Sequence, residues 1–202
     1  MKKYLLLIIF IAAFAGIASS CSLFGSKAPI RHYYQIYYKP KPILGRQVSG
    51  TVRIRTFDVD KIYRRHNLLF RTSPYEVFYY NTHFWASRPA DMITDLVAAH
   101  VKETGLFSDV IMQLDRRPDY VMTGRIRALD EIDSDDIWFA RVSMIFELKD
   151  YRTDRTIITH SFDRRKEVHN QRQVYVVRAM GEMLEEEIEK FFNKIYEKLN
   201  ID

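Results

Sequence analysis

The chain has 202 residues, of which 47% are hydrophobic and 14% aromatic, and its formal net charge at pH 7 is +5. This share of apolar residues is enough to bury a core, and the length fits one domain. The single cysteine excludes a disulfide within the chain.

Residues 1–21 have the order of a bacterial secretory signal that ends at the only cysteine. Two lysines form a positive n-region, an apolar stretch over residues 5–17 follows, and three small residues stand immediately before Cys21. Such a segment is removed rather than folded, and its apolar stretch is shorter than the roughly 20 residues that a membrane-spanning helix needs. The sequence therefore predicts a signal peptide over residues 1–20.

The position of Cys21 resembles the lipobox of bacterial lipoproteins, although Ala18 stands where that motif prefers leucine. The resemblance implies that Cys21 is diacylated on its thiol, with palmitate as the acyl group, and becomes the N-terminus of the mature chain. An unpaired thiol would otherwise be unusual in an oxidising compartment. The alternative is an ordinary secretory signal in which Cys21 lies near the cut by chance.

The residue after the cysteine bears on the membrane that holds the protein. Ser22 differs from the aspartate that commonly retains lipoproteins at the inner membrane, so the predicted location is the periplasmic face of the outer membrane. Two or three acyl chains form a stable anchor, because each buried methylene contributes about 0.8 kcal/mol. Residues 21–31 are then a lipidated N-terminus and short tether, and residues 32–202 form a single domain.

The positive charge of the chain is spread out rather than gathered in one run. Arginines occur in pairs at residues 64–65, 116–117 and 164–165. Such pairs are typical of a solvated face, and anionic lipid headgroups or an acidic protein partner are the alternatives. No nucleic-acid partner is expected for an exported protein.

The first half of the mature chain shows strand and turn signals before one helix. Residues 32–38 predict an extended entry that a proline ends, and residues 51–57 predict a half-buried strand. Residues 68–80 predict a β-hairpin with a proline in its turn. Residues 90–104 place apolar side chains on one helical face, and the glycine that follows is suited to end that helix.

The second half predicts a meander of three antiparallel strands over residues 119–130, 138–149 and 156–163. The middle strand has the cleanest period-two alternation of apolar side chains in the chain. The acidic segment 130–136 lies between the first two strands and lacks the glycine and terminal glutamate of a calcium-binding EF-hand loop. It is therefore predicted to be a solvated hairpin turn.

Residues 173–199 carry apolar side chains at spacings of three and four, which predicts one long amphipathic helix. This helix is expected to pack on the chain's own sheet, and a coiled coil is the alternative. The predicted fold class is therefore α+β, an antiparallel-rich mixed β-sheet with two main helices packed on one face.

Six features follow one another along the chain: the lipobox, the aromatic entry at 33–37, the strand TVRIRTFDV with the hairpin LLFRTSPYEVFYYN, the helix entry Trp85–Pro89, the strand start DYV at 119–121, and the long C-terminal helix. In this order and spacing they resemble the ABC-type transport auxiliary lipoproteins, the PqiC-like group associated with MCE-type lipid transport systems. The resemblance covers residues 32–199, which is nearly the whole mature chain.

The resemblance implies a non-enzymatic, membrane-anchored auxiliary lipoprotein that docks a lipid transport machinery at the outer membrane. Its implied partners are a protein with MCE domains and the permease and ATPase of an ABC transporter, with outer-membrane lipid contacted through the acyl anchor. Formation of a homo-oligomer is left open. The alternatives are a lipoprotein subunit of another envelope assembly, such as lipopolysaccharide insertion or secretion, and a periplasmic enzyme.

No catalytic residue, metal site or cofactor is expected from the motifs of the chain. The six histidines fall in different predicted elements without a ligand spacing, and the sequence has no P-loop, GxGxxG or GxSxG motif. Candidate contacts with a partner or a lipid are Trp85, Phe84 and Tyr80, because large aromatic side chains contribute disproportionately to interfaces. For Trp85 the alternative is a core side chain at the junction of helix and sheet.

Overall fold

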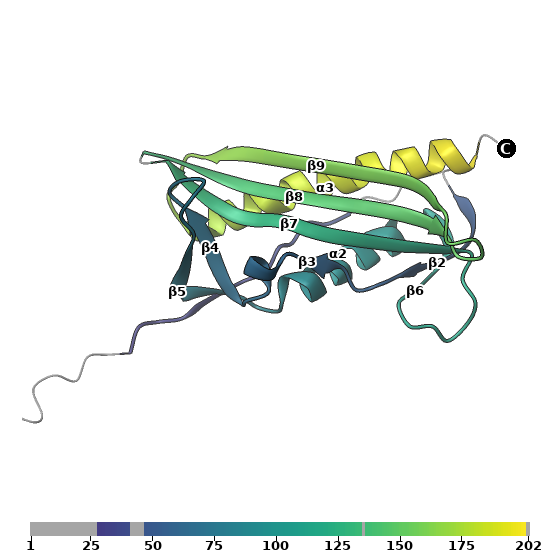
Figure 1. Ribbon diagram of the computed structural model, residues 1–202, viewed down its shortest axis with the longest axis horizontal. Helices are drawn as coiled ribbons and strands as arrows, with labels where there is room; N and C mark the ends of the chain where they lie inside the picture. The colour runs from purple at the N-terminus through teal and green to yellow at the C-terminus, as the bar shows by residue number, and fades with distance from the viewer. Residues whose placement is uncertain (1–27, 41–46, 135, 201–202) are drawn as a thin grey trace, which may run out of the picture. The chain divides into compact units, whose positions relative to one another are not determined.

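The computed structural model describes residues 28–40, 47–134 and 136–200, so the predicted signal peptide and Cys21 lie outside the described residues. The chain from Arg31 onward forms one compact unit. Its elements, drawn in Figure 1, follow in chain order: β1 (His32–Tyr34), β2 (Val48–Ile54), β3 (Asp58–Val59), the 3-10 helix η2 (Lys61–Tyr63), β4 (Asn67–Arg71), β5 (Phe78–Trp85), α2 (Pro89–Thr104), β6 (Phe107–Ile111), β7 (Tyr120–Ser134), β8 (Ile137–Asp150), β9 (Thr156–Val168) and α3 (Gln173–Leu199).

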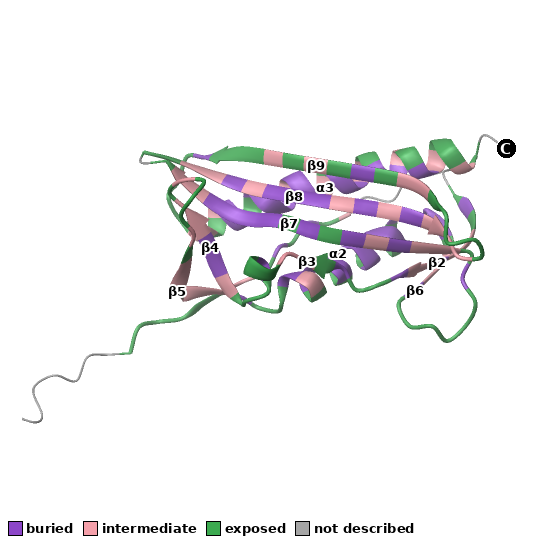
Figure 2. Ribbon diagram, in the orientation of Figure 1, coloured by how far each residue is buried: buried purple, intermediate pink, exposed green. Residues whose placement is uncertain are grey.

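Three long antiparallel strands form one side of the sheet, with β8 between β7 and the edge strand β9. In β8 every second residue from Ala140 to Leu148 is buried, and Figure 2 shows the alternation along the strand. Burial with a period of two is expected of a strand that has one face against a core. It confirms the strand predicted over residues 138–149. The third strand, β9, is longer than predicted and continues to Val168.

The second edge of β7 pairs with three short strands in series, each parallel to it. Its start pairs with β2, where Tyr120 lies opposite Val52, and its end pairs with β4, where Glu131 lies opposite Phe70. The two-residue strand β3 pairs between them. The sheet continues from β2 to β6 and from β4 through β5 to β1. The antiparallel pair β4–β5 confirms the predicted hairpin, and the mixed sheet with two helices confirms the α+β class.

Both helices lie on the same side of the sheet (Figure 1). The Phe191 ring of α3 stacks on Phe146 of β8, with ring centroids 5.5 Å apart, and His100 of α2 meets Phe192 of α3 at 5.0 Å. Gly105 follows α2 with a left-handed φ of 66°, as expected of a residue that ends a helix. The packing of α3 on the chain's own sheet confirms the prediction made from its apolar stripe.

A β-bulge in β7 changes which side chains face the helices. Ile126 pairs with Met144, but Ala128 pairs with Ser143, so Arg127 is an extra residue on the β7 side of the ladder. Because paired residues of an antiparallel ladder share a face, even-numbered residues of β7 face the helices before the bulge and odd-numbered residues face them after it.

Candidate functional site

Aromatic rings form a continuous row along β4, β5 and β1. Successive ring centroids in this aromatic row lie between 4.7 and 5.6 Å apart. Its members are, in order, Phe78, Phe70, Tyr80 and His83, and the rings of His32 and Tyr34 both contact that of His83. Phe78 is 42% exposed at one end, His32 is exposed near the other, and the remaining rings are half-buried. The row therefore exposes part of its aromatic surface to solvent, while the rest packs against the protein.

The structure separates the three aromatic residues predicted to contact a partner or a lipid. Tyr80 lies in the aromatic row, half-buried. Phe84 is also half-buried but lies outside the row, with its ring 5.6 Å from that of Tyr33. Trp85 is only 2% exposed and its side chain belongs to the core. The contact of Tyr80 and Phe84 with a partner or a lipid stays a prediction.

The prediction of a solvated turn for the acidic segment is wrong up to Ser134, where β7 ends, and the first two residues of the segment are buried. Asp130 is 0% exposed because Tyr63 and Arg71 cover it. The Tyr63 hydroxyl donates to Asp130 Oδ2 at 2.7 Å, and Arg71 Nε donates to the same oxygen at 2.5 Å. Burial, with the Asp130 charge beside it, raises the pKa of Tyr63. Asp130 is thus half of a buried ion pair.

Glu131 is buried without a cationic partner. Its Oε1 accepts a hydrogen bond of 2.7 Å from the Tyr80 hydroxyl, and its Oε2 has no hydrogen-bond partner. Burial raises the pKa of Glu131 to about 7, although the hydrogen bond from Tyr80 acts in the opposite direction. The carboxyl that supports the aromatic row therefore changes charge near neutral pH.

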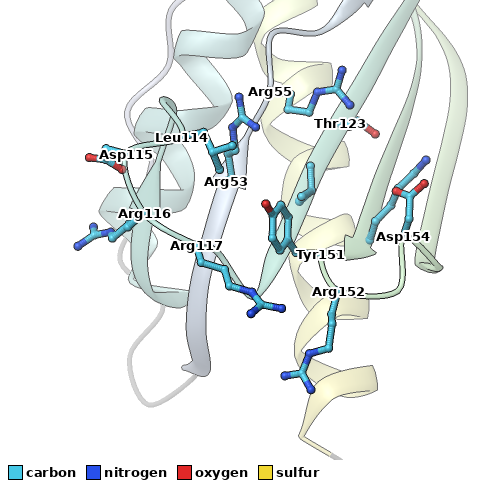
Figure 3. A pocket seen from close by; sticks show the side chains of 12 residues that line it. Arg53, Arg55, Leu114, Asp115, Arg116, Arg117, Thr123, Tyr151, Arg152 and Asp154 are labelled. Atoms are coloured by element: carbon cyan, nitrogen blue, oxygen red, sulfur yellow. The ribbon is translucent and has the colours of Figure 1, made fainter.

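A hollow of about 680 Å³ lies near the start of β7. Its lining comes from three stretches of the chain: β2 with the residue that follows it, the β6–β7 loop with the start of β7, and the end of β8 with the β8–β9 turn (Figure 3). We call it the arginine groove. Its lining residues are Arg53, Arg55, Leu114, Asp115, Arg116, Arg117, Val121, Thr123, Lys149, Tyr151, Arg152 and Asp154.

The lining carries six cationic side chains and only two carboxylates. Two of the cations are paired outside the lining, Arg116 with Asp109 and Lys149 with Glu147, the latter at 3.6 Å. The other four are Arg53, Arg55, Arg117 and Arg152, and none of them forms an ion pair within the described part of the chain. The groove is therefore a region of unbalanced positive charge.

The groove could not be recognised from the sequence, because its arginines are far apart along the chain. Of these arginines, only Arg116 and Arg117 form an adjacent pair in the sequence, and that pair was predicted to belong to a solvated face. A signal existed in β2 and just beyond it, where Arg53 and Arg55 alternate with the buried Val52 and Ile54. That alternation shows that both arginines share a face, but not that the β6–β7 loop and the β8–β9 turn lie against it.

The described ranges hold neither a metal-ion cluster nor a membrane-spanning helix. No group of three histidine, aspartate or glutamate side chains is placed there to hold a metal ion. Neither α2 nor α3 is long and apolar enough to cross a membrane, and no other described helix is.

The fold and the two surface features define a compact α+β domain with an exposed aromatic surface and a cationic groove. The chain belongs to the family of ABC-type transport auxiliary lipoprotein components, whose model matches residues 40–190. Membership confirms the family inferred from the order of the sequence features. A search of curated proteins found no match.

Solved structures support the fold. The crystal structure of protein XCC0632 from Xanthomonas campestris matches with a TM-score of 0.74 and 17% identity, over 82% of this chain and 95% of that one. A crystal structure titled only as an uncharacterized protein matches with a TM-score of 0.65 and 14% identity, over 83% and 99% of the two chains. The hypothetical protein CT253 from Chlamydia trachomatis matches with a TM-score of 0.50 and 8% identity, over 76% and 99%. At these identities the likeness concerns the fold alone.

Proposed function

We propose that this chain is the non-enzymatic, lipid-anchored auxiliary subunit of an MCE-type lipid transport system and docks that system at the outer membrane. The observation that carries the proposal is the family match over residues 40–190, since that family serves ABC-type transport. The energy for transport then comes from the ATPase of the transporter, and this subunit contributes binding surfaces.

The anchor of the proposed subunit is Cys21, which carries acyl chains at the periplasmic face of the outer membrane. Residues 21–31 tether the folded unit to that anchor. A Cys21→Ala variant loses the acylated thiol, so it is expected to leave the membrane fraction or to remain uncleaved. Normal retention of the processed variant in the outer membrane would contradict the anchor.

The aromatic row is the proposed docking surface for the MCE protein. Partly exposed aromatic rings bury large apolar areas at little entropic cost, so they contribute strongly where a partner covers them. Tyr75, three residues before Phe78 in the chain, is 94% exposed in the β4–β5 turn. Tyr80 lies within this surface, and Phe84 lies on the opposite side of β5, next to Tyr33.

Crosslinked affinity purification of the membrane-bound protein, with partners identified by mass spectrometry, tests the proposal. Recovery of an MCE-domain protein together with its ABC permease is the expected result. A Phe78→Glu variant places a charge in the aromatic row and is expected to reduce that recovery at least several-fold. Tyr37→Glu is the matched control, because Tyr37 is an exposed aromatic residue (75%) outside the row.

Two outcomes would contradict the proposal. Recovery of only unrelated envelope proteins, with crosslinking shown to work, would favour a subunit of another envelope assembly. Equal recovery with Phe78→Glu and with the control variant would remove the aromatic row as the docking surface and leave the transport role to other surfaces.

A further inference from the structure

The arginine groove holds four guanidinium groups that form no ion pair among the described residues, and its cations outnumber its carboxylates. Figure 3 shows Arg53 and Arg55 on one side of the Tyr151 ring and Arg117 and Arg152 on the other. Within the described ranges, Arg53 Nε donates one long hydrogen bond of 3.5 Å to the Met112 carbonyl oxygen. Four cations around one hollow repel each other, and an anion in the hollow relieves that repulsion.

The kind of cation indicates the kind of anion. A guanidinium presents several N–H donors in a planar fork that matches two oxygens of a phosphate or a carboxylate. Arginines that approach from several segments can surround a tetrahedral anion, whereas a flat carboxylate offers oxygens in only one plane. A hollow of about 680 Å³ lies in the usual size range of small-molecule sites, which is about 300–1,000 Å³. The groove therefore has room for a phosphate with groups attached to it.

The rim of the groove is apolar on one side. Leu114 lines the groove and is 52% exposed, and Met112 just before it is 43% exposed. Val121 and the Tyr151 ring add apolar surface inside. Free inorganic phosphate would not use this surface, but the glycerol and first acyl carbons of a lipid would cover it. Arginines beside exposed aliphatic side chains thus match a molecule that joins a phosphate to an apolar portion.

We propose that the arginine groove binds the phosphate of an anionic phospholipid headgroup. Assignment of the ligand as a lipid rests on the proposed function in lipid transport, while binding of a phosphate group rests on the groove alone. The positive charge of Arg53, Arg55, Arg117 and Arg152 attracts the phosphate into the groove, and Leu114 covers the start of the acyl chains.

Isothermal titration calorimetry on the full-length protein in a non-ionic detergent tests this inference. The ligands are dihexanoyl phosphatidylglycerol below its critical micelle concentration, dihexanoylglycerol without phosphate, and inorganic phosphate. Phosphatidylglycerol is expected to bind at least tenfold more tightly than inorganic phosphate, and dihexanoylglycerol is expected not to bind. Affinity should fall with increasing salt, because the contacts are ionic.

Matched variants locate the site. Arg55→Gln and Arg117→Gln each remove one guanidinium and should weaken phosphatidylglycerol binding by roughly tenfold or more, as expected for loss of a charge-assisted contact. Arg165→Gln is the control, because Arg165 is exposed on β9 and does not line the groove. Thermal unfolding of each variant shows that it is folded.

Each remaining outcome overturns part of the proposal. Inorganic phosphate binding as tightly as the lipid would overturn the headgroup assignment in favour of a free phosphate. Absence of binding by both phosphate compounds, or unchanged affinity in Arg55→Gln and Arg117→Gln, would overturn the site. The measurement uses the purified protein without partners, so a negative result is distinct from failure to recover an MCE protein by crosslinking.

Discussion

The charged side chains at the two ends of β7 differ in burial. At the end beside β4, Asp130 and Glu131 are buried, and tyrosine hydroxyls donate hydrogen bonds to both carboxyls. At the end beside β2, the arginine groove leaves Arg55 and Arg117 exposed to solvent without ion pairs among the described residues. One strand thus connects a region where charge is enclosed with a region where charge is presented.

The difference separates stability from binding. A buried charge has lost its hydration, so removal of its partner is costly to the folded state. An exposed cation keeps its hydration and adds little to stability, but it remains available to a ligand. Substitutions at the β4 end should therefore change the free energy of unfolding, and substitutions at the β2 end should change affinity instead.

The largest effect is expected for Asp130→Ala, which leaves Arg71 and the Tyr63 hydroxyl without their common acceptor. Loss of one partner of a buried pair costs about 3 kcal/mol of unfolding free energy. Urea denaturation measures it, with Arg55→Ala as the control that should change stability by less than about 0.5 kcal/mol. Equal changes in unfolding free energy for the two substitutions would contradict the difference between the two ends of β7.

A pH-dependent effect is expected for Glu131→Gln. The pKa of Glu131 is raised to about 7 in the folded chain from 4.5, so the unfolded chain holds this proton less tightly. The wild-type protein therefore loses stability as pH rises from about 4.5 to 7, and a glutamine removes that loss. The stability of the variant relative to wild type should increase by about 3 kcal/mol between pH 4.5 and pH 8.

Tyr80→Phe sharpens the same measurement. The Tyr80 hydroxyl stabilises the ionised form of Glu131, so its removal should raise the pKa of Glu131 further and move the loss of stability to higher pH. The free energy of unfolding, measured at several pH values, gives the pH at which half of this loss has occurred. A midpoint that does not move would mean that the hydroxyl does not hold the ionised carboxyl.

The smallest effect on stability is expected at the groove. Arg53→Gln combined with Arg55→Gln relieves repulsion between exposed cations, which should stabilise the protein by no more than about 0.5 kcal/mol at low ionic strength. The gain should vanish in high salt, because exposed charges are screened. Denaturation at two salt concentrations measures it, and a loss of more than 1 kcal/mol would show that these arginines support the fold.

Elements with strong local patterns could be predicted from the sequence. The strand β8 and the helix α3 each repeat apolar residues at the period of their own geometry, and the order of the elements identified the family. One residue of the predicted α3 stripe, Val174, is 40% exposed, because it lies in the first turn of the helix.

Features that depend on distant segments could not be predicted. The strand β3 is only two residues long and exists because β7 runs beside it. Asp130 and Glu131 look like turn residues, but a bulge four residues upstream of Glu131 and tyrosines from η2 and β5 bury them. Neither site was foreseen as a whole: Tyr80 was named without its row, and the arginines of the groove meet only in the folded sheet.

The position of β7 also has a consequence for the order in which the protein can fold. When the chain is synthesised or exported from its N-terminus, β2, β3 and β4 become available before β7, the strand to which all three are hydrogen-bonded. Until β7 follows, these segments expose unpaired strand edges, which are prone to aggregation. Pairings between segments this far apart along a chain form slowly. Arrival of β7 is thus the event that joins these segments into one sheet, and a chain stopped before it should not reach the native fold.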